Sequence, residues 1–224
     1  NTMALMTPLL ELIVIRFTKN KQIQVEEEFK PSMNSLWLQE ARHAAAYQDF
    51  AKQLIYPFYG KKFVSKVPWI LRQIMRAPLS VQLAGLAFGE HASAVFSRQI
   101  LQNPRLLEGV EPNIKALWLW HSQEELEHQS VSFDLQQKMG IKIPQKIFGA
   151  FLYLLFFCSK YAYYLFKMMS RDQKSLAFMI NCLLRGLFIS PGFLAYSWKP
   201  LLCFFQRDFH PNKKNDAILS DSIG

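Results

Sequence analysis

Acidic residues and histidines gather most densely in residues 118–128, which read WLWHSQEELEH. At 3.6 residues per turn, an α-helix places four of these side chains within about 100° of one another: His121, Glu124, Glu125 and His128. Burying carboxylates and imidazoles in so short a run is costly unless a cation receives them. The stretch therefore predicts a helix that presents metal ligands to the interior of the protein.

The composition favours an all-α fold. The chain has 224 residues, half of them hydrophobic, so it can bury a large core. Asn-Gly and Asp-Gly hairpin signals are absent. We expect six or seven helices and no strand, over residues 7–18, 32–56, 69–102 with a break at Pro78, 111–139, 147–169 and 175–205 with a break at 190–192. The second helix turns one stripe inward, formed by Leu36, Glu40, His43, Tyr47 and Phe50.

Four successive helices supply acids and histidines in a regular order. The series is Glu11, then Glu40 with His43, then Glu90, then Glu125 with His128. This is the ligand pattern of a dinuclear carboxylate site in a ferritin-like four-helix bundle. Two divalent ions would balance the four carboxylates, since no lysine or arginine lies on the predicted inward faces. Oxygen and imidazole ligands favour iron or manganese, and zinc is also compatible with them.

Other polar residues of these helices can support the ligands. His121 and Glu124 are candidate catalytic residues that move protons at the site. His91 and Asp134 are expected next to the ligands, where Asp134 would orient a ligand histidine. Glu127 points about 100° away from His128 and is expected to face solvent or a residue that supports a ligand.

The C-terminal part of the chain differs in character. Residues 1–140 carry 15 basic and 13 acidic residues, whereas residues 141–224 carry 11 basic and 4 acidic residues. Basic residues among long aromatic and aliphatic runs favour an anionic membrane surface, and no nucleic-acid motif is present. The expected organisation is a metal-binding bundle at 1–140, hydrophobic basic helices at 141–210 in the same domain, and a flexible tail at 211–224. The hydrophobic helices can be core helices, interfacial helices or membrane spans.

Cysteine usage indicates the compartment. Cys158, Cys182 and Cys203 are odd in number, lie in apolar runs and lack CxxC spacing, which favours a reducing environment. No signal peptide is expected, because Glu11 interrupts the apolar residues 3–15, although the natural chain can begin upstream of Asn1. We expect a cytoplasmic protein, peripheral to or embedded in the inner membrane.

The motifs resemble those of the bacterial "predicted metal-dependent hydrolase" family. The similarity lies in WHSQEELEH at 120–128 followed by SVSFD at 130–134, QEARH at 39–43, Glu90-His91, and Pro8-x-x-Glu11. It covers roughly residues 4–200. The resemblance implies a metal-dependent enzyme. Tyr47 stands where the family often has a second histidine, and we place it beside the ligands.

Three functions agree with these residues. The first is a hydrolase in which a metal-activated water attacks a small apolar or ester-type substrate. The second is a di-iron oxidase or oxygenase that acts on an apolar substrate. The third is a non-enzymatic metal-binding or membrane-associated bundle. The oligomeric state stays open.

Overall fold

The computed structural model describes residues 2–60, 69–188 and 193–212. These residues form helices and no strand, which confirms the all-α prediction. The main helices are α1 (Thr2–Thr18), α2 (Lys30–Phe50), α4 (Trp69–Ile74), α5 (Leu79–Gln102), α6 (Pro112–His128), α7 (Val131–Lys138), α8 (Ile143–Arg171), α9 (Leu176–Phe188) and α10 (Phe193–Cys203). Short helical turns η1 (Glu27–Phe29), η2 (Ala51–Ile55), α3 (Tyr56–Tyr59) and η4 (Pro104–Leu107) join them.

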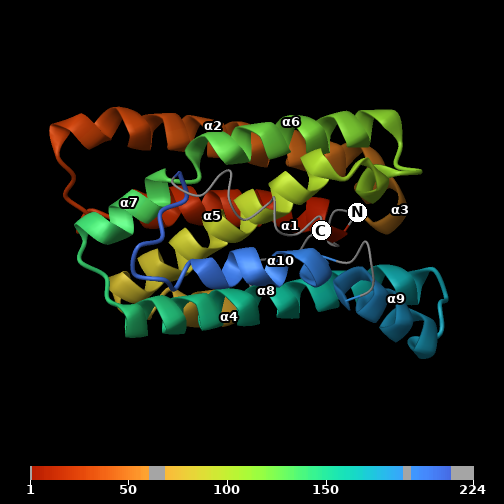
Figure 1. The fold of residues 1–224 in the computed structure, drawn as a ribbon. Coiled ribbons are helices and arrows are strands. Elements are labelled where there is room, and N and C mark those ends of the chain that lie inside the picture. The colour runs from red at the N-terminus through yellow and green to blue at the C-terminus, as the bar shows by residue number, and fades with distance from the viewer. Residues whose placement is uncertain (1, 61–68, 189–192, 213–224) are drawn as a thin grey trace.

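The long helices lie in three layers (Figure 1). Helices α2 and α6 form one outer layer, α1 and α5 form the middle layer, and α8 with α10 covers the other side. Helix α1 packs mainly on α2, and α5 packs on α6, α7 and α8. The four helices α1, α2, α5 and α6 therefore enclose a common interior, in which their acidic residues can meet. The more specific assignment to a ferritin-like bundle stays a prediction.

The inward stripe of α2 agrees with the sequence pattern. Its buried residues are Met33, Leu36, Glu40, His43, Ala44, Tyr47 and Phe50. They recur at the three- and four-residue spacing that keeps side chains on one face of a helix. This face brings Glu40 and His43 into the interior together, so the position of the polar pair follows from the apolar residues around it.

The helices are interrupted at two places that bear on the predicted ranges. The break at Pro78 is confirmed, because α4 ends at Ile74 and α5 begins at Leu79. The single helix predicted over residues 111–139 is wrong: the chain leaves α-helix at residues 129–130 and begins again as α7. The Gln129 side chain donates to the Leu126 carbonyl at 3.2 Å. A side chain that takes a backbone acceptor in this way competes with the helical ladder.

Glycines set the close approach of α5 and α8. A Cβ atom on Gly149 would lie 2.5 Å from the Gly85 nitrogen, and a Cβ atom on Gly89 would lie 2.6 Å from the Tyr153 ring. Larger side chains would therefore force the helices apart. This packing holds Tyr153 of α8 against the same turn of α5 that carries Glu90.

Helix α8 has two unlike faces. Its buried residues are Gly149, Ala150, Phe156, Lys160 and Tyr164, whereas many of its other apolar side chains are exposed. The helix is long and apolar enough to cross a membrane, and 28 % of its most apolar stretch is buried in the protein. Only one face of α8 is thus used to cover the middle layer.

Candidate metal centre

Four buried side chains from three helices converge in the interior. Glu11 comes from α1, His43 from α2, and His121 and Glu125 come from α6. One ligand atom of each lies within 4.8 Å of the others. Two carboxylate oxygens and two imidazole nitrogens form a donor set suited to a divalent first-row metal ion.

Local helix geometry explains half of this convergence. His121 and Glu125 are one turn apart on α6, so they share a face. His121 Nε2 lies 3.7 Å from Glu125 Oε1 and 3.9 Å from Glu11 Oε1. His43 Nδ1 approaches the same Glu125 oxygen at 3.4 Å. Tetrahedral ligand atoms about 2.1 Å from one ion lie about 3.4 Å apart, so the spacing fits a shared cation.

Glu124 fixes the orientation of His43. Glu124 Oε2 lies 3.0 Å from His43 Nε2, and a carboxylate can only accept, so Nε2 carries the proton. The lone pair of Nδ1 then faces Glu125. Two such acceptors repel each other unless a proton or a metal ion lies between them. A carboxylate that holds the far nitrogen of a histidine is the usual support of a histidine metal ligand.

Glu124 is itself held in place. Trp120 Nε1 donates to Glu124 Oε1 at 3.1 Å, and an Arg42 guanidinium nitrogen lies 3.3 Å from the same oxygen. Sequence reasoning assigned Glu124 a catalytic role. The structure places it behind His43, where it holds the ring of a candidate ligand.

Glu40 adds a further carboxyl group to the centre. Its Oε2 lies 4.0 Å from His43 Nδ1, and its side chain is fully buried. Burial raises the pKa of Glu40 well above its usual value, a contact with Glu11 opposes this, and the charges of Glu90, Glu125 and Glu124 raise it further. A cation among these carboxylates would relieve both effects, which supports the fit of a metal to this donor set.

Tyr47 lies beside the centre. Its ring is 5.1 Å from the His121 ring and 5.3 Å from the Trp118 ring. Burial, together with the charges of Glu11 and Glu125, raises the pKa of Tyr47 well above its usual value. The hydroxyl therefore stays protonated, and the ring lies against the candidate ligand His121.

Two predicted neighbours of the ligands lie elsewhere. His91 Nε2 donates to the Pro200 carbonyl at 3.0 Å, and burial lowers the pKa of His91 to about 4. Asp134 accepts from His210 Nε2 at 2.9 Å, so it orients a histidine outside the cluster.

Glu127 faces solvent and accepts from Gln39 at 3.3 Å. The predicted ligand His128 has a side chain outside the described residues.

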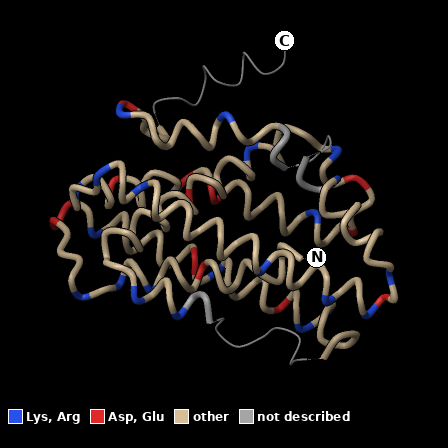
Figure 2. Tube along the Cα trace, turned by 90° about the horizontal axis from the view of Figure 1, so that it is seen from below, with Lys and Arg blue, Asp and Glu red and all other residues tan. Residues whose placement is uncertain are grey.

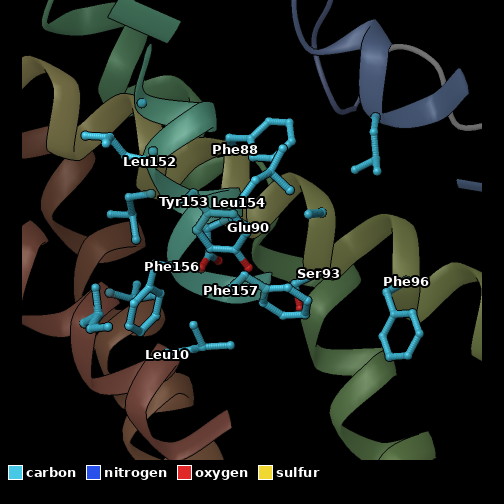
Figure 3. A pocket seen from close by; sticks show the side chains of 18 of the residues that line it. Leu10, Phe88, Glu90, Ser93, Phe96, Leu152, Tyr153, Leu154, Phe156 and Phe157 are labelled. Atoms are coloured by element: carbon cyan, nitrogen blue, oxygen red, sulfur yellow. The ribbon is translucent and has the colours of Figure 1, made fainter. Parts of the chain in front are cut away.

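A cavity of about 510 Å³ adjoins the centre. Glu11, Glu90, His121 and Glu125 line it, and the remaining wall is mostly apolar. Figure 3 shows Glu90 surrounded by side chains of α1, α5 and α8, among them Leu10, Phe156 and Tyr153. Sequence reasoning missed the contribution of α8, although the glycines at 85, 89 and 149 mark its close contact with α5.

Comparison with curated proteins and with solved structures finds no match. The comparison with family models matches residues 1–215 to the family described as predicted metal-dependent hydrolase. This range includes every residue of the buried cluster and all described helices, and it agrees with the resemblance carried by the sequence motifs. The chain therefore belongs to the family of predicted metal-dependent hydrolases.

Proposed function

We propose that the protein is a hydrolase whose active centre holds two divalent metal ions. Glu11, His43, His121 and Glu125 would bind one ion, and Glu40 with Glu90 would contribute to the second. The convergence of the four ligand atoms within 4.8 Å carries the proposal. Two divalent ions would balance the charge of the four glutamates, which supports the number of ions. Iron or manganese suits the oxygen-rich donor set, and zinc is compatible with it.

The ions would act as Lewis acids that lower the pKa of water and polarise the bond to be broken. The chain's own groups position the reaction. Glu124 accepts a hydrogen bond from the Nε2–H group of His43 and thereby turns Nδ1 toward the centre. Glu11, Glu90 and His121 line the cavity, so a substrate held there meets the ligands directly.

A di-iron oxidase or oxygenase is the second candidate. The apolar wall of the cavity favours it, because a substrate without a hydrolysable bond would also fit. Redox-silent zinc in an active esterase would support hydrolysis. An oxo-bridged iron absorption that bleaches on reduction would support oxygen chemistry.

We also propose that α8, α9 and α10 rest on an anionic membrane surface at the cytoplasmic side. Exposed apolar side chains mark this face, among them Phe148, Phe151, Leu155, Leu176, Phe178, Leu184, Trp198 and Leu202. Figure 2, which views the molecule from this side, shows long stretches of the chain without charged residues between the lysines and arginines. Residues 143–207 carry 8 basic residues and 1 acidic residue. Apolar area and positive charge together favour binding to anionic lipid.

Metal content and ester hydrolysis test the function. Protein never exposed to chelator should contain close to two divalent ions per chain and should hydrolyse p-nitrophenyl esters. Glu125→Ala should lose metal and activity, because it removes the oxygen that both histidines approach. Glu127→Ala is the matched control, since Glu127 faces solvent on the same helix, and it should retain both. Absence of metal in the untreated protein, or equal losses in the two variants, would contradict the proposal.

A further inference from the structure

The cavity extends on both sides of the metal centre. Along α1 its lining runs from Met3 to Phe17, with Glu11 between them. At 1.5 Å per residue the wall continues about 12 Å from Glu11 toward Met3 and about 9 Å toward Phe17. Along α5 it runs from Val81 to Ser97 and again has an acid, Glu90, near its middle. The acids thus lie midway along an elongated space.

Each half of the cavity has an apolar wall. We call the half toward Phe17 the inner arm and the half toward Met3 the outer arm. The inner arm is lined by Val14, Phe17 and Leu86, which belong to one core cluster. The outer arm is lined by Met3, Phe96 and Trp118, and the Phe96 and Trp118 rings lie 6.2 Å apart. Figure 3 shows Phe96 on one side of Glu90, with Leu152 and Phe156 on the other.

The volume matches one chain. If a methylene takes about 30 Å³, the share of a water molecule in the liquid, then 510 Å³ holds on the order of 17 carbon atoms. A substrate with a charged end would have to bury that end in an apolar arm, which is costly. A polar group inside the chain would instead reach the acids while both of its alkyl segments lie in apolar arms.

The lining of this space includes residues that are exposed at the surface of α8 and α10. Leu154 of α8 and Leu202 of α10 line the cavity and are 42 % and 57 % exposed. Cys158 and Trp198 also combine lining with exposure. These residues belong to the exposed apolar face of α8 and α10, so an apolar chain can enter from that face without first crossing a polar wall.

We infer that the cavity binds a single alkyl chain whose reactive polar group lies in the interior of the chain, with an apolar segment in each arm. For the proposed hydrolase this means an ester or related bond between two medium-length chains, not a bond at the end of one long chain. The inference rests on the proposed function for the identity of the reacting group. The occupation of both arms rests on the cavity alone.

Two isomeric ketones test whether the polar group lies inside the bound chain or at its end. A ketone resembles an ester but is not hydrolysed, so its binding can be measured at equilibrium. The full-length protein saturated with Mn²⁺ is filled with the neutral fluorescent dye Nile red, and 8-hexadecanone or 2-hexadecanone displaces it. At about 1.2 Å per bond, as in an extended backbone, the fourteen-carbon segment of 2-hexadecanone spans about 17 Å and exceeds either arm. We expect 8-hexadecanone to bind at least tenfold tighter. Equal binding of the two ketones would overturn the inference.

Variants of α1 test the outer arm. Met3→Trp should shorten this arm and reduce the preference for 8-hexadecanone at least fivefold. Leu12→Trp is the matched control, because Leu12 is exposed on the same helix and does not line the cavity. It should keep the preference, and thermal melting would verify that both variants fold. An unchanged preference in folded Met3→Trp would refute the assignment of the outer arm.

The two proposals fail in distinguishable ways. If short esters are hydrolysed with metal present but neither ketone displaces the probe, then the hydrolase proposal stands and the chain site is wrong. If metal and hydrolysis are absent but 8-hexadecanone still binds tenfold tighter than its isomer, then the chain site stands and the proposed reaction is wrong.

Discussion

The contact between Glu124 and His43 gives the sharpest prediction about metal affinity. Glu124→Ala removes the acceptor of the His43 Nε2 proton, which lies 3.0 Å away. A hydrogen bond to a charged group contributes about 1.5–3 kcal/mol, and the Glu124 side chain is only 16 % exposed, so water replaces it poorly. The ring of His43 can then rotate and exchange tautomers. We expect the dissociation constant of the metal to rise about 10–100-fold, as for other supporting carboxylates.

The assay is competition for Mn²⁺ or Zn²⁺ against a fluorescent chelator at fixed pH. Glu124→Gln should recover part of the affinity, because its amide oxygen still accepts from Nε2. Glu127→Ala should bind metal like the unaltered protein, since its contact is an exposed one with Gln39. If Glu124→Ala stays within threefold of the unaltered protein, then Glu124 does not position His43 and the account of the centre is wrong.

Two further predictions concern pH and membranes. The raised pKa of Glu40 means that the metal-free folded chain keeps a proton that the unfolded chain has released. The free energy of unfolding should therefore fall as the pH rises above about 4.5, by up to about 1.4 kcal/mol per pH unit. Urea unfolding after chelation should show this slope and Glu40→Gln should reduce it; a slope of the opposite sign would contradict the burial of a protonated Glu40. The full chain should co-sediment with anionic vesicles at low salt and less at high salt, and Phe151→Glu should weaken this; a chain that stays in the supernatant at low salt would exclude the membrane surface.

Local periodicity explains why much of the centre is visible in the sequence. Glu40 and His43 follow the spacing of the apolar residues of α2, so any helix that buries Leu36 and Phe50 also buries this pair. Glu11 was identified as the single acid of an apolar helix and the first member of the acid series. In both cases the surroundings within one helix determine which way the side chain points.

The choice among neighbours on α6 depended on contacts that no single helix contains. His121 and His128 lie on either side of Glu125 at four and three residues, so helical phase alone cannot rank them. Glu124 looked like a ligand or catalytic acid until α2 placed His43 against it. His91 follows the acid Glu90, yet it bonds to Pro200, which lies far along the chain. These assignments are set by tertiary packing.

The same packing links the centre to the apolar face of the molecule. Gly85 and Gly149 bring α5 and α8 into backbone contact, which limits the space between these helices at that level. Farther along α8, Leu154 and Cys158 line the cavity and remain exposed, so the wall opens there. The close contact of α5 with α8 at the glycines and the exposed lining farther along α8 together give an apolar molecule access to the buried carboxylates. Water-soluble substrates would not need such a route, and this favours chemistry on a chain taken from a lipid phase.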